Sequence, residues 1–253
     1  MASAAAFDLA AASYDSGFGR TAAARVFRHV FQDCLLARFR AGARLVDLGC
    51  GTGEDAVFLA ASGYSVLGVD SSPRMIEAAR AKAGRAGLAP PALRFEVARA
   101  EDVAGEFDGA YSNFGALNCC DLPAVGRALA RALRPGSPVV LSVMAEASLP
   151  KQARRLWKGG SREPRADGIR RVAGLPVPIA TPSPSEVRSA LGTEFDWQGG
   201  FALGVVMPGP EFASWPSRHP QLFGLLAIAE RSIRSWPLFR SGGDHNVLVG
   251  VRR

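Results

Sequence analysis

The chain has 253 residues, 48% of them hydrophobic, and none of its apolar runs approaches the roughly 18 residues that a membrane-spanning helix needs. These values exclude a transmembrane segment and predict a single large domain with its own core. The four cysteines, at positions 34, 50, 119 and 120, lack metal-type spacing, so we expect reduced thiols and no metal site. The N-terminus has no basic leader. We therefore expect a soluble, cytoplasmic protein.

The net charge of +7 is concentrated in the second part of the sequence. Residues 1–150 hold 15 basic and 15 acidic side chains, whereas residues 151–253 hold 15 basic and 8 acidic ones. The densest run, residues 151–171, has 8 basic and 2 acidic side chains. Such a run can attract phosphates, carboxylates or an anionic membrane surface, and it can equally be a solvated face.

The first predicted element is a helix over residues 20–40. Its apolar residues recur three and four positions apart, which gives a helix one buried stripe; they are Phe27, Val30, Phe31, Cys34 and Leu35. His29 falls outside this stripe, and we expect it at the surface. Together with the residues before it, the helix forms a predicted N-terminal helical cap over residues 1–41.

Strand and helix then alternate over residues 42–144. Residues 44–49 and 64–70 are short apolar runs with a helical segment between them, which is the pattern of a βαβ unit. The alternation continues with a helix capped by Ser72, strands over 93–98 and 107–114, a helix capped by Asp121, and a strand over 137–144. This order predicts an α/β fold in which helices cover both faces of a parallel sheet.

The alternation breaks after residue 144. Residues 145–182 contain the basic run and a proline-rich stretch, a combination that predicts a lid inserted after the fifth strand. Regular structure resumes at a capping box formed by Ser183 and Glu186, and residues 183–253 supply the remaining strands and helices. We therefore predict one domain with a doubly wound, seven-stranded, mostly parallel sheet, whose cofactor-binding core spans residues 42–144.

A glycine-rich turn between the first strand and its helix marks the predicted ligand site. Residues 47–53 read D-x-G-x-G-x-G, and a doubly wound sheet binds its ligand at this turn. The dinucleotide fingerprint needs a third glycine where this chain has Glu54, and a carboxylate there repels a pyrophosphate. The spacing therefore disfavours an NAD(P)-dependent oxidoreductase.

The turn resembles motif I of the class I S-adenosylmethionine-dependent methyltransferases, whose cofactor has no phosphate. Asp70 ends the second strand 21 residues after Gly49, where this family presents an acidic residue to both ribose hydroxyls. The resemblance covers residues 46–143 and implies a Rossmann-like fold with S-adenosyl-L-methionine as cofactor. It places these residues at the cofactor: Asp47, which touches the ligand or orients the turn, and Gly49, Cys50, Gly51, Gly53, Asp70, Ser71 and Met75.

The adenine contact departs from the usual pattern of the family. Many relatives have an acidic residue for the adenine amino group where this chain has Arg99. Either Glu101 or Asp102 takes over this contact, or the backbone of Ala100 and Glu101 makes it alone. We expect Glu101 to do so.

The methionine end of the cofactor has two sets of expected neighbours. Tyr14 and Arg20 match N-terminal residues that fold over this end in many relatives. Asn113 and Phe114 follow the fourth strand, where the acceptor meets the sulfonium in this family.

The resemblance further implies methyl transfer to a small-molecule acceptor. Such a transfer depends mainly on alignment in a dry pocket, and it needs a general base only when the acceptor keeps its proton. Candidates for a catalytic role are Asn113, His219, His245 and Tyr14. The basic lid suits an anionic or amphiphilic acceptor, with four predicted contacts at Arg154, Arg155, Arg170 and Arg171.

Two other functions remain open for the same cofactor site: an RNA or protein methyltransferase, and a catalytically silent adenosylmethionine-binding regulator. Nucleic-acid enzymes usually add a recognition module or a motif such as N-P-P-Y after the fourth strand, whereas this chain has S-N-F-G-A-L-N. We therefore expect no nucleic-acid partner. The sequence leaves the acceptor and the oligomeric state open.

Overall fold

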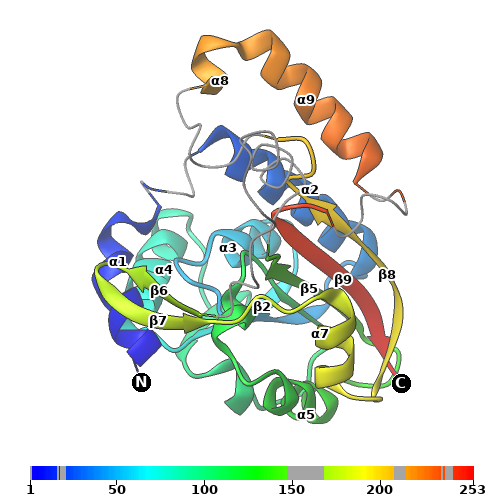
Figure 1. Cartoon of the computed structure of the whole chain (residues 1–253). Coiled ribbons are helices and arrows are strands. Elements are labelled where there is room, and N and C mark those ends of the chain that lie inside the picture. Colours follow the sequence, from blue (N-terminus) through cyan, green and yellow to red (C-terminus); the bar gives the residue numbers. More distant parts are fainter. Residues whose placement is uncertain are drawn as a thin grey trace.

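A seven-stranded sheet organises the chain in a computed structural model, which describes residues 2–15, 17, 21–146, 168–207, 215–234, 236 and 242–253. The strand order is β3-β2-β1-β4-β5-β9-β8 (Figure 1). The strands are β1 Arg44–Leu48, β2 Ser65–Asp70, β3 Leu93–Val97, β4 Gly109–Ser112, β5 Pro138–Met144, β8 Phe195–Leu203 and β9 His245–Arg252. Strand β9 pairs antiparallel with both β5 and β8, and the other strand pairs of this sheet are parallel. The predicted mostly parallel, Rossmann-like sheet is confirmed.

Helices cover both faces of the sheet, as the alternating pattern predicts. Helices α2 (Ala22–Arg38), α3 (Glu54–Ala61) and α4 (Pro73–Arg85) contribute to one hydrophobic cluster. Helices α5 (Leu122–Ala132) and α7 (Pro184–Leu191) contribute to the cluster on the other face. Successive residues of β1 divide between the two clusters, because side chains of a strand alternate. The core therefore has two layers with the sheet between them.

The helix starts lie where side chains can accept hydrogen bonds from free backbone N–H groups. Ser72 accepts from the amide of Met75 at the start of α4, and Asp121 caps α5 in the same way. At α7, Ser183 and Glu186 form the complete capping box. These three helix starts match the sequence predictions.

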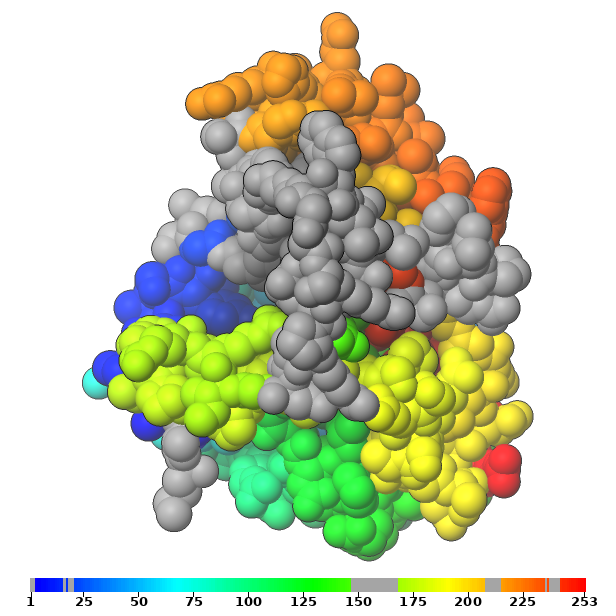
Figure 2. Space-filling view, in the orientation of Figure 1, coloured from blue at the N-terminus to red at the C-terminus, as the bar shows by residue number. Residues whose placement is uncertain are grey.

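The N-terminal helix α1 (Ala2–Tyr14) lies beside a two-stranded hairpin of the insertion (Figure 1). The hairpin consists of β6 (Gly168–Val172) and β7 (Leu175–Ile179). Ala6 of α1 is buried in a small cluster with Val177 and Ile179 of β7. Figure 2 shows the yellow-green hairpin at the surface next to the blue helix. The described part of the predicted lid is thus a hairpin that packs on α1.

Asn118 ties this hairpin to the sheet. It belongs to the short 3-10 helix η3 (Ala116–Cys119) and is 3% exposed. Its side-chain Nδ2 donates to the carbonyl oxygens of Met144 and Ala180, and its Oδ1 accepts from the Met144 amide at 2.8 Å. One buried side chain therefore joins the end of β5 to the residue that follows β7.

Two helices, α8 (Trp215–Arg218) and α9 (Pro220–Ile233), lie at the far end of the molecule from α5 (Figure 1). Glu230 of α9 is fully buried and accepts three backbone hydrogen bonds, from Gly204, Val205 and Val206. This carboxylate attaches α9 to the segment after β8. None of the described helices is long and apolar enough to cross a membrane.

We predict that Asn118→Ala lowers the free energy of unfolding by about 3 kcal/mol, because it removes three hydrogen bonds that a buried side chain makes with the backbone of Met144 and Ala180. Urea unfolding measures this loss. Gln198→Ala is the control, since this exposed amide bonds only the exposed Arg38 among the described contacts, and it should change stability by less than about 0.5 kcal/mol. Equal losses in the two variants would contradict the role of Asn118.

Candidate functional site

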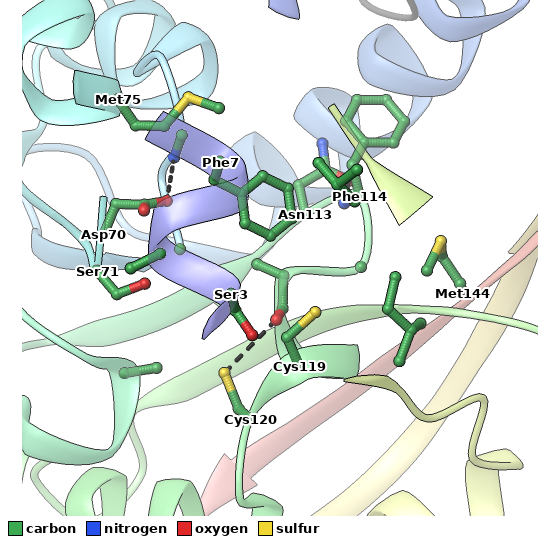
Figure 3. A pocket seen from close by; sticks show the side chains of 18 of the residues that line it. Ser3, Phe7, Asp70, Ser71, Met75, Asn113, Phe114, Cys119, Cys120 and Met144 are labelled. Carbon is green, nitrogen blue, oxygen red and sulfur yellow. Dashed lines mark hydrogen bonds between the residues drawn. The ribbon is translucent and has the colours of Figure 1, made fainter. Parts of the chain in front are cut away.

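A cavity of about 770 Å³ lies at the carboxyl ends of the parallel strands. Its walls come from α1, the turn after β1, the ends of β2, β4 and β5, the segment after β3, η3 and the hairpin. Figure 3 shows Asp70, Ser71 and Met75 on one side of it and Phe114 and Met144 on the other, with Phe7 of α1 between them. Segments far apart in the sequence therefore line one cavity.

The glycine turn forms the floor of the cavity. Gly49, Gly51 and Gly53 have φ values of 68°, 53° and 77°, in the left-handed region that favours glycine. A Cβ at Gly49 would lie 2.3 Å from the Cβ of Ala116, whereas one at Gly51 would meet no atom within 4 Å. Gly49 and Gly51 line the cavity. Gly53 does not, since its missing Cβ faces the ring of Phe95 at 2.6 Å.

Asp70 joins the glycine turn to the start of α4. Its Oδ2 accepts from the Gly51 amide at 3.0 Å, and its Oδ1 accepts from the Ser72 amide at 2.9 Å. Burial raises the pKa of Asp70, although these two N–H donors oppose the rise. Ser71 and Met75 line the cavity beside it. The end of β2 thus presents a fixed carboxylate, as the sequence predicts.

Glu101 lies at the β3 side of the cavity, in the 3-10 helix η2 (Ala100–Asp102). Its Oε1 accepts from Arg99 at 2.9 Å and from the Asp121 amide at 3.0 Å. Burial alone would raise the pKa of Glu101, but these hydrogen bonds outweigh burial and lower it. Ala100 and Glu101 both line the cavity, so the two alternatives for the adenine contact lie side by side.

Two expected cofactor residues lie behind the cavity wall. Asp47 is 3% exposed, faces Tyr111 across the β1–β4 pair and does not line the cavity. Burial raises its pKa well above the usual range, and the nearby Asp55 adds to the rise. The side chain of Cys50 packs against the core, and burial also raises its thiol pKa. This placement favours the interpretation that Asp47 orients the turn.

Asn113 and Phe114, at the end of β4, line the cavity as expected and belong to a network that the sequence did not indicate. The Asn113 Nδ2 donates to Asp55 Oδ2 at 2.9 Å, and the Phe114 amide donates to Asn113 Oδ1 at 2.8 Å. Asp55 also accepts from Arg28 at 2.6 Å and from Gln32 at 2.9 Å. From sequence, Asp55 looks like an ordinary acidic residue in a first helical turn, so it carried no signal.

Helix α1 covers the cavity and is anchored at two acidic residues. Asp8 accepts from the Ser72 hydroxyl at 2.6 Å and from the Arg74 amide at 3.0 Å. Asp15 accepts from the Thr52 hydroxyl at 2.6 Å. Between them, Tyr14 lines the cavity, and burial raises its phenol pKa. Arg20, the other expected N-terminal contact, lies outside the described residues.

The four arginines expected at the acceptor fall into three groups. Arg170 of β6 lines the cavity. Arg171 does not, and its guanidinium instead donates to the Gly174 carbonyl of the hairpin turn at 2.7 Å. Neighbouring residues of a strand point to opposite faces, which explains the difference. Arg154 and Arg155 lie outside the described residues.

The two candidate histidines have different surroundings. His245 is buried, lines the cavity, and meets the ring of Phe114 edge-on with a centroid distance of 5.6 Å. Its Nδ1 lies 3.5 Å from a carboxylate oxygen of Asp244. His219 is exposed at the start of α9 against Trp215 and does not line the cavity. Among the described residues, no group of three His, Cys, Asp or Glu side chains could hold a metal.

Comparison with known proteins agrees with this geometry. Residues 45–136 match the family model of a methyltransferase domain. The chain is 36% identical over 176 residues to a trans-aconitate 2-methyltransferase of Deinococcus radiodurans, which covers 67% of the chain and 65% of the relative. It is 33% identical over 182 residues to a malonyl-[acyl-carrier protein] O-methyltransferase of Erwinia pyrifoliae, over 70% of the chain and 63% of the relative.

The chain belongs to the class I S-adenosylmethionine-dependent methyltransferases. It spans slightly less than two thirds of the length of these two relatives. The solved structure of the magnesium protoporphyrin IX methyltransferase from Synechocystis, with bound S-adenosylhomocysteine, has the same fold with a TM-score of 0.57 at 17% identity. That alignment covers 90% of this chain and 83% of the other.

The cavity fits S-adenosylmethionine, the cofactor of this family. The fixed carboxylate of Asp70 can accept from two ribose hydroxyls, and the open space over Gly51 leaves room for a ligand against the backbone. Glu54, at the start of α3, would repel a phosphate but not this cofactor, which has none. These residues therefore suit a nucleoside whose ribose carries no phosphate.

Cys119 and Cys120 also line the cavity. Burial raises the pKa of the Cys120 thiol to about 12, and the nearby Glu101 carboxylate adds to the rise. Because only the thiolate is nucleophilic, the native thiol is unreactive at neutral pH.

We predict that iodoacetamide alkylates Cys120 about a thousandfold more slowly in the native protein than in the urea-unfolded chain at the same pH. The native rate should rise about tenfold per pH unit between pH 7 and 9, because the pH stays below the raised pKa. Mass spectrometry of a Cys119→Ser variant measures the rate at Cys120 alone. A native rate within tenfold of the unfolded rate would contradict the burial of this thiol.

Proposed function

We propose that the protein transfers the methyl group of S-adenosylmethionine to an anionic small-molecule acceptor. One observation carries the proposal: a single cavity is lined both by Asp70, at the end of β2, and by Arg170, in the hairpin that packs on α1. The carboxylate suits the ribose of the cofactor, and the guanidinium suits a carboxylate or similar anion. Both ligands would then share one cavity.

The strand order gives the direction in which the cofactor would lie. Neighbouring strands are about 4.8 Å apart, and the order β3-β2-β1-β4-β5 runs across the cavity. With the ribose at Asp70 on β2, the adenine lies toward η2, which follows β3. The methionine part then lies over the glycine turn after β1. Phe114 follows β4 and is therefore roughly two strand spacings from Asp70. This position puts Phe114 on the side of the sulfonium.

The acceptor side of the cavity combines apolar walls with a basic group. Phe7, Phe114, Met144 and Ile179 supply apolar surface there, and Arg170 supplies the positive charge. When bound, S-adenosylmethionine supplies an electrophilic methyl group. A carboxylate acceptor is already deprotonated at neutral pH, so the protein needs only to bind and orient it.

The names of the two relatives support an acceptor of this class. One acts on trans-aconitate and the other on malonyl-[acyl-carrier protein], and each of these compounds has a free carboxylate. In the proposed reaction, a carboxylate oxygen forms a bond to the methyl carbon while the carbon–sulfur bond breaks and its electron pair stays on sulfur. No proton is transferred, which agrees with a site built for positioning.

The cofactor part of the proposal predicts that Gly51→Val abolishes S-adenosylhomocysteine binding while the fold persists. The new side chain would enter the open space above the glycine turn. Gly42→Val is the matched control, because Gly42 also has positive φ and open space but lies outside the cavity. Titration calorimetry and circular dichroism give the two readouts. Normal binding by the Gly51→Val protein would refute the proposed cofactor site.

The acceptor part predicts a difference between two adjacent arginines. Arg170→Ala should raise the KM for a carboxylate acceptor about tenfold or more by removing a charge-assisted contact, and the effect should shrink at high salt. Arg171→Ala should leave this KM unchanged, since Arg171 bonds the hairpin turn instead.

Transfer of a labelled methyl group to trans-aconitate and to a malonyl thioester provides the assay for these variants. The affinity for S-adenosylhomocysteine should stay the same in both. Equal KM values for Arg170→Ala, Arg171→Ala and the unchanged protein would exclude Arg170 from the acceptor site. Failure of the unchanged protein to methylate either compound would count against a carboxylate acceptor without touching the cofactor assignment.

A further inference from the structure

The buried carboxylate of Asp55 lies one side chain away from the cavity. It is 5% exposed and belongs to the first turn of α3. Three side chains from two other segments donate to it: Arg28 and Gln32 of α2, and Asn113 at the end of β4. A carboxylate that receives three side-chain hydrogen bonds fixes all of its donors.

Two of these three donor residues, Asn113 and Arg28, also contact Phe114. Asn113 uses its Oδ1 to accept from the Phe114 amide, while its Nδ2 is held by Asp55. The guanidinium carbon of Arg28 lies 4.7 Å above the centre of the Phe114 ring. Gln32 contacts the same carboxylate, but no described contact joins it to Phe114. Asp55 is thus connected to the Phe114 backbone through Asn113 and to the face of the Phe114 ring through Arg28.

Phe114 has a backbone conformation that needs such support. Its φ is 50°, which is uncommon for a bulky residue and disfavoured by contacts of its Cβ. Residues held in sparsely populated conformations persist only where surrounding contacts over-determine them, and they concentrate at functional sites. Phe114 lines the cavity, and the ring of His245, which also lines it, stands at 80° to the Phe114 ring.

We propose that Asp55 is a positioning residue that, through Asn113 and Arg28, holds the Phe114 ring against the sulfonium end of the bound cofactor. The inference rests on the proposed function, because it takes S-adenosylmethionine as the ligand. The face of an aromatic ring attracts a cation more strongly than a neutral group, whereas its edge does not. S-adenosylmethionine has a sulfonium and S-adenosylhomocysteine a neutral thioether, so a correctly placed ring favours the former.

Three ligands separate this role from a general structural one. Adenosine reports on the Asp70 side of the cavity only, and the ratio of affinities for S-adenosylmethionine and S-adenosylhomocysteine reports on the sulfonium side. Asp55→Asn and Phe114→Leu should each lower this ratio about tenfold, because the cation loses its aromatic neighbour. Both variants should keep the adenosine affinity of the unchanged protein. The measurement is calorimetry of all three ligands at one pH and salt concentration.

Gln32→Leu is the matched control. It removes a hydrogen bond from the same carboxylate without touching the path to Phe114, so the ratio should stay within twofold of its original value. Phe114→Leu also keeps the test open if Asp55→Asn does not fold, because it removes the ring and leaves the buried network in place.

The inference is supported only if Phe114→Leu, and Asp55→Asn where it folds, lower the ratio and Gln32→Leu does not. It is overturned if Phe114→Leu leaves the ratio unchanged, if a folded Asp55→Asn protein leaves it unchanged, or if Gln32→Leu lowers it as much. Absence of binding by the unchanged protein would instead refute the proposed function, so the two failures differ.

Discussion

The hydrogen bonds of the Asp70 carboxylate are the contacts on which the rest of the site depends. They join β2 to the glycine turn through the Gly51 amide and to the start of α4 through the Ser72 amide. The turn has three left-handed glycines in seven residues and needs an external partner to hold one conformation. A single side chain therefore fixes the floor of the cavity while leaving the space above Gly51 open.

The cover of the cavity is held differently from its floor. Helix α1 and the hairpin share only a small apolar cluster around Ala6, Val177 and Ile179, whereas the sheet is packed between two large ones. Within the described part of the chain, polar contacts at the edges, from Asp8, Asp15 and Asn118, add to the attachment. Elements with little buried apolar area open at lower free energy than a core. The cover is thus the part of the fold best suited to admit and release ligands.

The sequence predicted those features that depend on local signals. Ser72 and Ser183 cap helices because their hydroxyls bond amides three residues away, and the glycine turn needs glycine at each left-handed position. Arg170 and Arg171 could not be told apart, because the pairing that turns one inward depends on the hairpin register. The role of Asp55 was also hidden, since its donors come from segments up to 58 residues away. Local signals therefore predict the helix starts and the glycine turn, whereas long-range packing decides which side chains line the cavity.

The buried charges beneath the cavity fit a cationic ligand. Asp47, Asp55 and Asp70 lie under or beside the glycine turn, and Arg28 forms an ion pair with Asp55 at 2.6 Å. Burial raises the pKa values of Asp47 and Asp70, which means that their charged forms are disfavoured without a compensating positive charge. In the proposed reaction the sulfonium supplies such a charge before methyl transfer, and the neutral thioether that forms does not. In that reaction these carboxylates would favour the cationic cofactor over the neutral product.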